Sequence, residues 1–485
     1  MANAQSASPK PLATRSILAF ASTATPQAAI LLATGTYLVP LYTVHVGISL
    51  VAYTMATVAV RLVDLTFDPF LGWAMDKTNT AFGRFRPWFV AGVPLTLLGV
   101  YMLLNPPAGA NVAYLMIWYL TMWIGVSMLT LSHASWAASL STNYHERSRI
   151  YGWMTALGPI GSAGLLAAPI LAGGKTFNIG GFELHMPLIG AHPLVLGSAE
   201  SYHPVTMLIL VVLPLTTFLM AGLTPERLVT ETKRQSFGFK DYWDIVKRPT
   251  MMKLIWADLF LILGPGVTGP LYIFFFHQIK KFPQEDINYL LIFYIGAALL
   301  GGLIWARVAK KIGKHRTLQV SCVAYAIAQS SLMMMPAGMF WLSCFGMFCV
   351  GFCVSAHILM IRSMVADYAD EIRLEQGKER SGVLYALVTT TQKVGASINV
   401  LLVLPLLQLV FHFDPKKPVN DEFALIGLQA CYLFTPIIFV IAAALMFMKY
   451  NLTEARHQEI RDALAAREEA ESVEMSAEAS APAVS

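Results

Sequence analysis

Long apolar stretches separated by short polar segments follow one another along the whole chain. A helix needs about 20 mostly apolar residues to cross the hydrocarbon core of a membrane, because each residue adds about 1.5 Å. The pattern therefore predicts twelve transmembrane helices and an all-α fold. In the first half of the chain their expected ranges are 18–45, 49–75, 87–105, 112–140, 149–172 and 203–223. In the second half they are 252–278, 288–308, 317–335, 338–366, 381–411 and 423–449.

The polar segments divide the chain into five parts. These are an N-terminal segment (1–17), a six-helix half (18–223), a linker (224–250), a second six-helix half (251–450) and a tail (451–485). The linker contains FGFKDYWDIVKRP, whose alternating aromatic and charged residues favour a helix at the membrane surface, although a solvated connector fits as well. The tail starts as a charged helical sequence and continues into Ala, Ser and Pro, so we expect a helix followed by disorder.

Composition excludes a soluble protein. Hydrophobic residues make up 56% of the 485 positions and charged residues only 13%, against about 25% charged residues in an ordinary soluble domain. Soluble enzymes, secreted scaffolds and disordered proteins are therefore excluded, and a multi-pass membrane protein is indicated. The five cysteines lie in apolar stretches without metal-ligand spacing, so we expect no metal or cofactor there. The polar N-terminus lacks the layout of a cleaved signal peptide.

Basic residues in the loops are distributed unevenly between the two sides of the predicted bundle. If the N-terminus is cytoplasmic, eighteen loop Lys and Arg residues lie on the cytoplasmic side. The opposite side carries only Lys175, Lys280, Lys281, Lys416 and Lys417. Because cytoplasmic loops carry the excess of positive charge, we expect both termini in the cytoplasm.

The two halves share a short repeat. The tripeptide Glu-Arg-Ser occurs at 146–148, after the fourth predicted helix, and again at 379–381, after the tenth. Two six-helix halves related by an internal repeat are typical of transporters, in which the substrate site lies between the halves near the middle of the membrane.

Three charged residues occur inside the second predicted helix, where a charge costs several kcal/mol unless it is paired or faces water. Arg61, Asp64 and Asp68 lie roughly 18–28 Å along this helix. Asp64 and Asp68 are four residues apart and share a face, on which Arg61 can pair with Asp64. Pro69 leaves the carbonyl of Leu65 without an amide donor. These oxygens suit a small cation such as Na⁺; alternatively, two like charges in a poorly solvated place make one carboxylate a proton carrier.

Two other interpretations of these residues stay open. An ion-pair network of the three charges would only stabilise the fold. The spacing of Asp64, Asp68 and Asp76 also resembles the aspartate-rich motif of intramembrane prenyltransferases. Such an enzyme needs a second motif, for which only Asp367 and Asp370 are candidates. Because twelve helices in two halves do not fit that class, we expect no enzymatic activity.

The loop after the second helix reads GWAMDKTNTAFGRFRPW. Asp76 near the helix end can latch neighbouring helices to Arg84 and Arg86 through charge-assisted hydrogen bonds. Gly72 and Gly83 permit close packing and a tight turn. We expect a cytoplasmic gate here, and a plain positively charged loop is the alternative. The loop resembles the one between helices two and three of the major facilitator superfamily.

A narrower resemblance covers nearly all of residues 15–450. The segments RLVDLTFDPFLGWAMDKT and FGRFRPW, together with MVADYADEIRLEQGKERSGVLYALVTTTQKVGAS, are similar to the melibiose permease family, the glycoside–pentoside–hexuronide:cation symporters. The resemblance implies a major facilitator fold and a plasma-membrane symporter. It further implies a coupling site of Asp64, Asp68, Lys393 and Thr389, and a second set of gate residues, Asp367, Asp370 and Arg380.

Lys393 also stands out without this resemblance. It lies about 13 residues into the eleventh predicted helix, so it needs an acidic partner, for which Asp64 and Asp68 are candidates. A lysine that extends along the helix to a membrane interface is the alternative. Ser127 of the fourth helix could offer a hydroxyl to the same site.

Two departures from the family bear on the ion and the solute. Sodium-using members have an asparagine just before the second aspartate, where this chain has Phe67, and this favours H⁺ over Na⁺. The two sugar-binding aspartates of melibiose permeases fall at Ala28 and Thr130, and their arginine of helix five is unmatched. Tryptophan faces suit stacking on sugar rings. The candidate solute contacts, each of which could instead only pack between helices, are Gln27, Thr130, His133, Trp136 and Trp153.

The sequence therefore predicts a secondary active transporter that works by alternating access. We expect symport of a small organic solute, a sugar or glycoside, with H⁺ favoured over Na⁺ as the coupling ion. A lipid-like amphipathic solute carried by the same fold is the alternative. The expected location is the plasma (inner) membrane, with the chain acting as a monomer in the lipid bilayer and without a cofactor or a nucleic acid partner.

Overall fold

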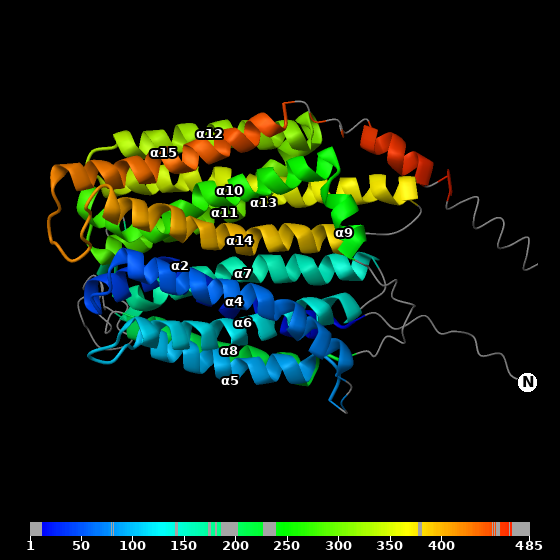
Figure 1. The fold of residues 1–485 in the computed structure, drawn as a ribbon, viewed down its shortest axis with the longest axis horizontal. Coiled ribbons are helices and arrows are strands. Elements are labelled where there is room, and N and C mark those ends of the chain that lie inside the picture. Colours follow the sequence, from blue (N-terminus) through cyan, green and yellow to red (C-terminus); the bar gives the residue numbers. More distant parts are fainter. Residues whose placement is uncertain are drawn as a thin grey trace, which may run out of the picture.

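Long helices that run side by side make up the chain (Figure 1). The computed structural model describes residues 12–78, 80, 82–140, 144–172, 176–179, 182–185, 202–226, 239–376, 381–448, 450, 452, 456–464 and 466–467. Arg380 lies outside the described residues, and so does the side chain of Asp76. The end of the tail, where the sequence predicts disorder, lies outside them as well.

The first group of helices ends before the linker. It contains α1 (Thr14–Ser22), α2 (Ala24–Thr36), α3 (Leu38–Pro40), the π-helix η1 (Leu41–His45), α4 (Leu50–Lys77), α5 (Arg86–Leu104), α6 (Val112–Leu140), α7 (Tyr144–Ala172) and α8 (His203–Leu223). The segments α1 to η1 follow one another without a loop and form one long element. Its breaks adjoin Ser22 and Thr36, because Pro26 and Pro40 have no amide hydrogen to donate to their carbonyls.

The second group repeats this plan. It contains α9 (Phe239–Val246), α10 (Pro249–Phe274), the π-helix η3 (Phe275–Ile279), α11 (Gln284–Ile312), α12 (Lys314–Met334), α13 (Phe340–Gln376), α14 (Ser381–Leu409) and α15 (Glu422–Met446). Both π-helices end the first long element of their group. The sequence Pro-Leu-Tyr occurs close to the start of each: residues 40–42 overlap the start of η1, and residues 270–272 lie shortly before η3. The two groups therefore share a local irregularity as well as their helix order.

Twelve long helical elements occupy the twelve predicted ranges within the described residues. Ten of them are long and apolar enough to cross a membrane. The other two, α7 and α12, have 29 and 21 residues, and each begins with charged residues such as Glu146 and Lys314. The clearest difference in length is α13, which continues to Gln376 beyond its predicted end at 366.

The two groups form two layers. In Figure 1, α2 to α8 lie in the lower layer and α10 to α15 in the upper one. Across the boundary α4 packs on α14, α7 on α11, and α2 and α3 on α10. Within the lower layer Gly99 and Gly125 let α5 and α6 approach closely. A Cβ at these positions would lie 2.6 Å from Met122 Cβ and 2.4 Å from Thr96 Oγ1.

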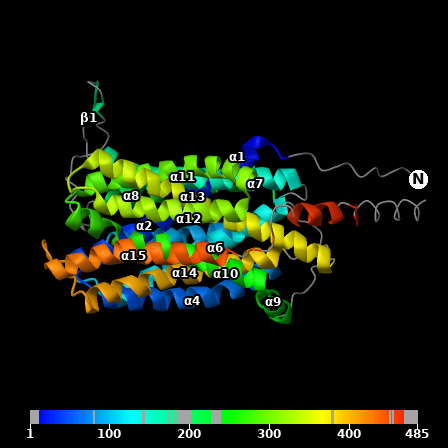
Figure 2. The same ribbon diagram turned by 90° about the horizontal axis from the view of Figure 1, so that it is seen from above.

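The start of α1 and the helical residues 456–464 lie at one end of the bundle, which we call the terminal end; the opposite end is the far end (Figure 2). At the terminal end the helical residues 456–464 pack on the upper layer through the buried Ile460 and Leu464. At the far end β1 (Thr176–Ile179) and β2 (Phe182–His185) form an antiparallel hairpin. The sequence did not predict this short hairpin, because its eight strand residues are too few to give a clear alternating pattern; every long element among the described residues is helical, as expected.

Candidate ion-coupling site and solute cavity

The three charges of α4 lie where the two layers meet. Ser49 starts α4 by accepting a hydrogen bond from Ala52 N (3.2 Å), and the helix then runs for 28 residues. Asp64 is only 1% exposed. Arg61 Nη1 lies 3.8 Å from Asp64 Oδ2, as the spacing of three residues predicts.

Lys393 of α14 reaches both aspartates from the other layer. Its Nζ lies 3.7 Å from Asp64 Oδ2 and donates a hydrogen bond to Asp68 Oδ2. It therefore pairs with the acids of α4 rather than extending to a membrane interface. Thr389, one turn earlier on α14, is exposed.

A third helix, α6, completes this ion cluster, by which we mean Arg61, Asp64, Asp68, Ser127 and Lys393. Ser127 Oγ donates a hydrogen bond of 2.7 Å to Asp64 Oδ1. The guanidinium carbon of Arg61 lies 3.2 Å from the centroid of the Trp123 ring, so this cation is held by an aromatic face as well as by Asp64.

The ion cluster is balanced in charge but not in hydrogen bonds. Two cations face two carboxylates, of which Asp64 is buried and Asp68 is half-buried; removing one partner would leave an uncompensated charge. Asp68 Oδ1 is buried and accepts no hydrogen bond from the described residues. The arrangement can therefore take up one more positive charge, a proton or a small cation, at Asp68.

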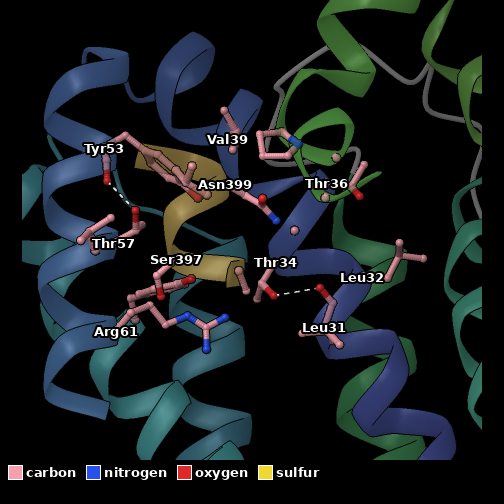
Figure 3. A pocket seen from close by; sticks show the side chains of 18 of the residues that line it. Leu31, Leu32, Thr34, Thr36, Val39, Tyr53, Thr57, Arg61, Ser397 and Asn399 are labelled. Atoms are coloured by element: carbon pink, nitrogen blue, oxygen red, sulfur yellow. Dashed lines mark hydrogen bonds between the residues drawn. The ribbon is translucent and has the colours of Figure 1, made fainter. Parts of the chain in front are cut away.

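A cavity of about 520 Å³ lies between the layers beside this cluster (Figure 3). Helices α2, α4, α6, α7, α10, α11 and α14 all contribute to its wall. In Figure 3 the Arg61 guanidinium points from α4 into the cavity, toward Thr34 of α2. The polar residues of the wall are Thr34, Thr36, Tyr53, Thr57, Arg61, Tyr119, Ser162, Tyr294, Ser397 and Asn399.

A smaller cavity of about 230 Å³ joins the ion cluster to this space. It is lined by Asp64 and Lys393, and it shares Val58, Arg61 and Ser397 with the larger cavity. An ion at the aspartates and a solute in the larger cavity would therefore lie on two sides of the same side chains.

Two hydrogen bonds join the layers on the far-end side of the cavity. Tyr37 Oη donates to Asn288 Oδ1 (3.0 Å), and Val51 N donates to Gln408 Oε1 (2.8 Å). Tyr37 and Asn288 are 1% and 3% exposed, so water does not pass between them. The cavity is thus closed at the far end.

The five predicted solute contacts lie elsewhere, since none of them is among the described residues that line the 520 Å³ cavity. Gln27 Nε2 and Thr130 Oγ1 donate to carbonyls of their own helices, at 3.0 and 2.9 Å. His133 Nε2 lies 3.0 Å from Thr23 Oγ1, and Trp136 is fully buried beside Phe20. Trp153 is 39% exposed. For His133 and Trp136 the structure favours the packing interpretation.

The predicted gate loop after α4 is held by a residue that the sequence did not single out. Glu226 accepts hydrogen bonds from the backbone amides of Arg84 (2.6 Å), Phe85 (2.7 Å) and Arg86 (3.3 Å). Arg86 Nη2 donates to Thr224 O at 2.7 Å. Glu226 thus caps the start of α5 and connects it to the end of α8. Gly72, which the sequence also assigned to this gate, lies within α4.

The second predicted gate lies at the terminal end of α13. Lys314 Nζ donates to Asp367 Oδ1 at 2.6 Å. His457 of the tail lies 3.4 Å from Asp367 Oδ1 and 3.1 Å from Asp370 Oδ2. In this structure both aspartates are therefore paired within the upper layer.

The arrangement of helices and the charged cluster between them match a known family of membrane transporters. A family model described as "MFS/sugar transport protein" matches residues 19–454. The chain belongs to the melibiose permease-like family of the major facilitator superfamily. The fold and family predicted from the sequence are thereby confirmed. Members of this family are transporters and not enzymes, so the prenyltransferase interpretation was wrong.

Individual relatives of this major facilitator protein are distant. An isoprimeverose transporter of Lactiplantibacillus pentosus is 25% identical over 307 residues, which are 61% of this chain and 59% of the relative. A Bacillus subtilis (strain 168) protein named "Uncharacterized symporter YnaJ" is 22% identical, and the match covers 87% of this chain and 88% of that protein. A crystal structure of the nucleoside transporter NupG has a TM-score of 0.65 at 10% identity and covers 90% of this chain and 100% of its own; this likeness shows the fold alone.

One buried carboxylate of this transporter was missed by the sequence reasoning. Asp258 of α10 is 3% exposed, and its Oδ2 has no hydrogen-bond partner among the described residues. Arg362 of α13 is the charged group that attracts it. A lone aspartate in the apolar run 252–278 was the signal that could have revealed it.

Replacing Glu226 with alanine should destabilise the transporter by about 2 kcal/mol, because it removes charge-assisted hydrogen bonds to three amides at the start of α5. Thermal unfolding of the detergent-solubilised protein measures the effect. Glu422→Ala, an exposed acid in the first turn of α15, is the matched control and should unfold at the wild-type temperature. Equal melting of the two variants would show that the Glu226 bonds contribute nothing.

Proposed function

We propose that this chain is a proton-coupled symporter that imports a small polyhydroxylated solute, a sugar or glycoside, by alternating access. The observation that carries the proposal is the wall shared by the two cavities. Arg61 and Ser397 line both the 520 Å³ cavity and the smaller one that reaches Asp64 and Lys393. Because ion and solute would bind on two sides of Arg61, binding of one changes the electrostatic field at the other.

The surroundings of the aspartates support a proton as the coupling ion. Lys393 occupies the space between Asp64 and Asp68 that a sodium ion would need. A hard cation also requires several oxygen ligands, and Phe67 supplies none. A proton bound to Asp68 removes the charge that holds Lys393 there, so that Lys393 is free to move toward Asp64. This exchange of partners couples the ion to a change in packing between α4 and α14.

The closed far end supports a direction for the cycle. If the terminal end faces the cytoplasm, as the loop charges predict, the transporter sits in the plasma membrane with its closed end toward the outside. Opening to the outside would break the Tyr37–Asn288 and Val51–Gln408 hydrogen bonds. Closing the inside would then form the gate pairs proposed for Asp76, Arg84, Arg86, Asp367, Asp370 and Arg380.

Uptake into proteoliposomes tests this function. The purified protein is reconstituted and offered radiolabelled xylose, glucose, lactose and raffinose under a pH gradient that is acid outside, or under a sodium gradient at equal pH. At least one sugar should accumulate with the pH gradient alone, and a protonophore should abolish the accumulation. Accumulation that needs Na⁺ and ignores pH would overturn the proton assignment, and no accumulation under either gradient would overturn the sugar assignment.

A lipid-like solute is the second candidate, and one observation favours it. Leu62 of α4 and Leu401 of α14 both line the 230 Å³ cavity and are 59% and 40% exposed. The seam between these helices could therefore admit an acyl chain from the side. Uptake of a radiolabelled lysophospholipid, with none of the four sugars accumulated, would select this function instead.

A further inference from the structure

The strongest unassigned feature of the cavity wall is the side-chain amide of Asn399. Asn399 lies on α14, six residues beyond Lys393, and Figure 3 shows its side chain at the cavity. It is only 6% exposed. Its amide nitrogen points to Ile262 O of α10, at 3.4 Å, and this contact orients the group. Its amide oxygen accepts no hydrogen bond from any described residue, an arrangement that buried polar groups normally avoid.

The neighbouring helix is built around this amide. Gly266 of α10 also lines the cavity, and a Cβ at that position would lie 2.0 Å from Asn399 Nδ2. Any other residue at 266 would therefore push the amide out of its place. Gly266 leaves room for a polar side chain whose oxygen accepts no hydrogen bond within the described part of the chain, and this points to a partner that arrives from the cavity.

Three hydroxyl groups of the cavity wall can act as hydrogen-bond acceptors, as this amide oxygen can. Thr34, Thr57 and Ser397 each donate their hydrogen to a carbonyl of their own helix, at 3.0, 2.9 and 3.1 Å. Each hydroxyl oxygen then has lone pairs left to accept a hydrogen bond. The main group that presents several donors to the cavity is the Arg61 guanidinium. This wall is rich in acceptors, so it suits a solute with many O–H donors and an acceptor oxygen turned toward Arg61.

We propose that Asn399 Oδ1 accepts a hydrogen bond from a hydroxyl of the transported solute, and that Gly266 is the positioning residue for it. The solute class is a neutral polyhydroxylated ring compound, recognised by the upper layer through α14 and α10. This assignment deepens the proposed function and rests on it. It also explains how a sugar can be bound although Ala28 and Thr130 replace the acidic residues of the melibiose type on the lower layer.

The test is uptake kinetics in proteoliposomes with whichever of xylose, glucose, lactose and raffinose the wild type accumulates. Asn399→Ala and Gly266→Ala should each raise KM about 10- to 100-fold, while the ratio of protons to solute stays at its wild-type value. Monodeoxy analogues of that sugar identify the hydroxyl. One analogue should bind the wild type with a raised KM, because it lacks the hydroxyl that donates to Asn399. For that analogue the Asn399→Ala substitution should leave KM unchanged, because the hydrogen bond is already absent.

Gln319→Ala is the matched control, because Gln319 also donates its amide to a helix carbonyl (Ala444 O, 3.2 Å) but lines none of the described cavities. Its KM should equal that of the wild type. Should Asn399→Ala fail to fold, the deoxy series on the wild type decides, since every monodeoxy analogue binding like the parent sugar would overturn the assignment. An unchanged KM in Asn399→Ala, with sugar still accumulated, overturns the Asn399 assignment alone, whereas a wild type that takes up no sugar overturns the proposed function as well.

Discussion

Asp68→Asn should abolish proton-driven accumulation while leaving solute exchange intact. Asparagine has the shape of a protonated aspartate but cannot release a proton, so the cluster stays in its loaded charge state and Lys393 is no longer held by a carboxylate at 68. With one proton per solute and a gradient of about one pH unit, the wild type can accumulate about tenfold, since 1.4 kcal/mol corresponds to a factor of ten. The variant should reach only the external concentration.

Two measurements separate lost coupling from lost binding. Counterflow, in which labelled solute exchanges against unlabelled solute without net proton movement, should persist in Asp68→Asn. Asp258→Asn is the control, because Asp258 is a carboxylate of a membrane helix that is buried even more deeply than Asp68 but lies outside the ion cluster. Tenfold accumulation by Asp68→Asn, with Asp64→Asn equally active, would contradict the coupling role of both residues. Loss of accumulation in Asp258→Asn as well would show that burial, and not position, explains the effect.

The ion cluster could be predicted from the sequence because a charged residue inside an apolar helix is costly, and such residues can be recognised from a short stretch of sequence. Charges at positions 61, 64 and 68 of one apolar helix must find partners, and their spacing already puts two of them on one face. Lys393 was the partner that the same reasoning required. The twelve helical ranges follow from hydropathy in the same way, since a membrane imposes a length on each apolar run.

The candidate solute cavity could not be predicted in the same way, because its residues come from many helices and each is an ordinary residue alone. Asn399 and Ser397 are isolated polar residues in the apolar segment that follows Lys393, and only the fold brings Asn399 next to Gly266 of α10. His133 and Trp136 stand out in the sequence for the opposite reason. Their residue types suit sugar binding, but the structure places them in contacts with α1 and its neighbour Thr23. Residue type without tertiary position does not separate binding from packing.

The positions of the ion cluster and of the larger cavity suggest how proton binding affects solute binding. Arg61 is held by Asp64 and by the Trp123 ring, and its guanidinium also points into the larger cavity, where we propose that the solute binds. When a proton neutralises Asp68 and Lys393 moves toward Asp64, Asp64 has less negative charge to share with Arg61. The guanidinium is then freer to bind a solute oxygen. Proton binding would thus precede tight solute binding.

Lys393→Ala should be the most destabilising single change in the cluster. It leaves the buried Asp64 and the half-buried Asp68 opposite Arg61 alone, and breaking a buried ion pair by removing one partner costs about 3–5 kcal/mol. Thermal unfolding in detergent at neutral pH measures this loss. Lys310→Ala, which removes an exposed lysine of α11, is the control and should melt like the wild type.

The double variant Lys393→Ala/Asp68→Asn decides whether the loss comes from the unpaired charge. It removes one cation and one anion together, so most of the lost stability should return, and the coupling energy between the two sites should be about 2–3 kcal/mol. Accumulation against the gradient should stay absent in the single and in the double variant, because neither retains a titrating carboxylate opposed by a mobile lysine. A double variant as unstable as Lys393→Ala would mean that Lys393 stabilises the helices by packing, and a double variant that accumulates solute would place the coupling ion elsewhere.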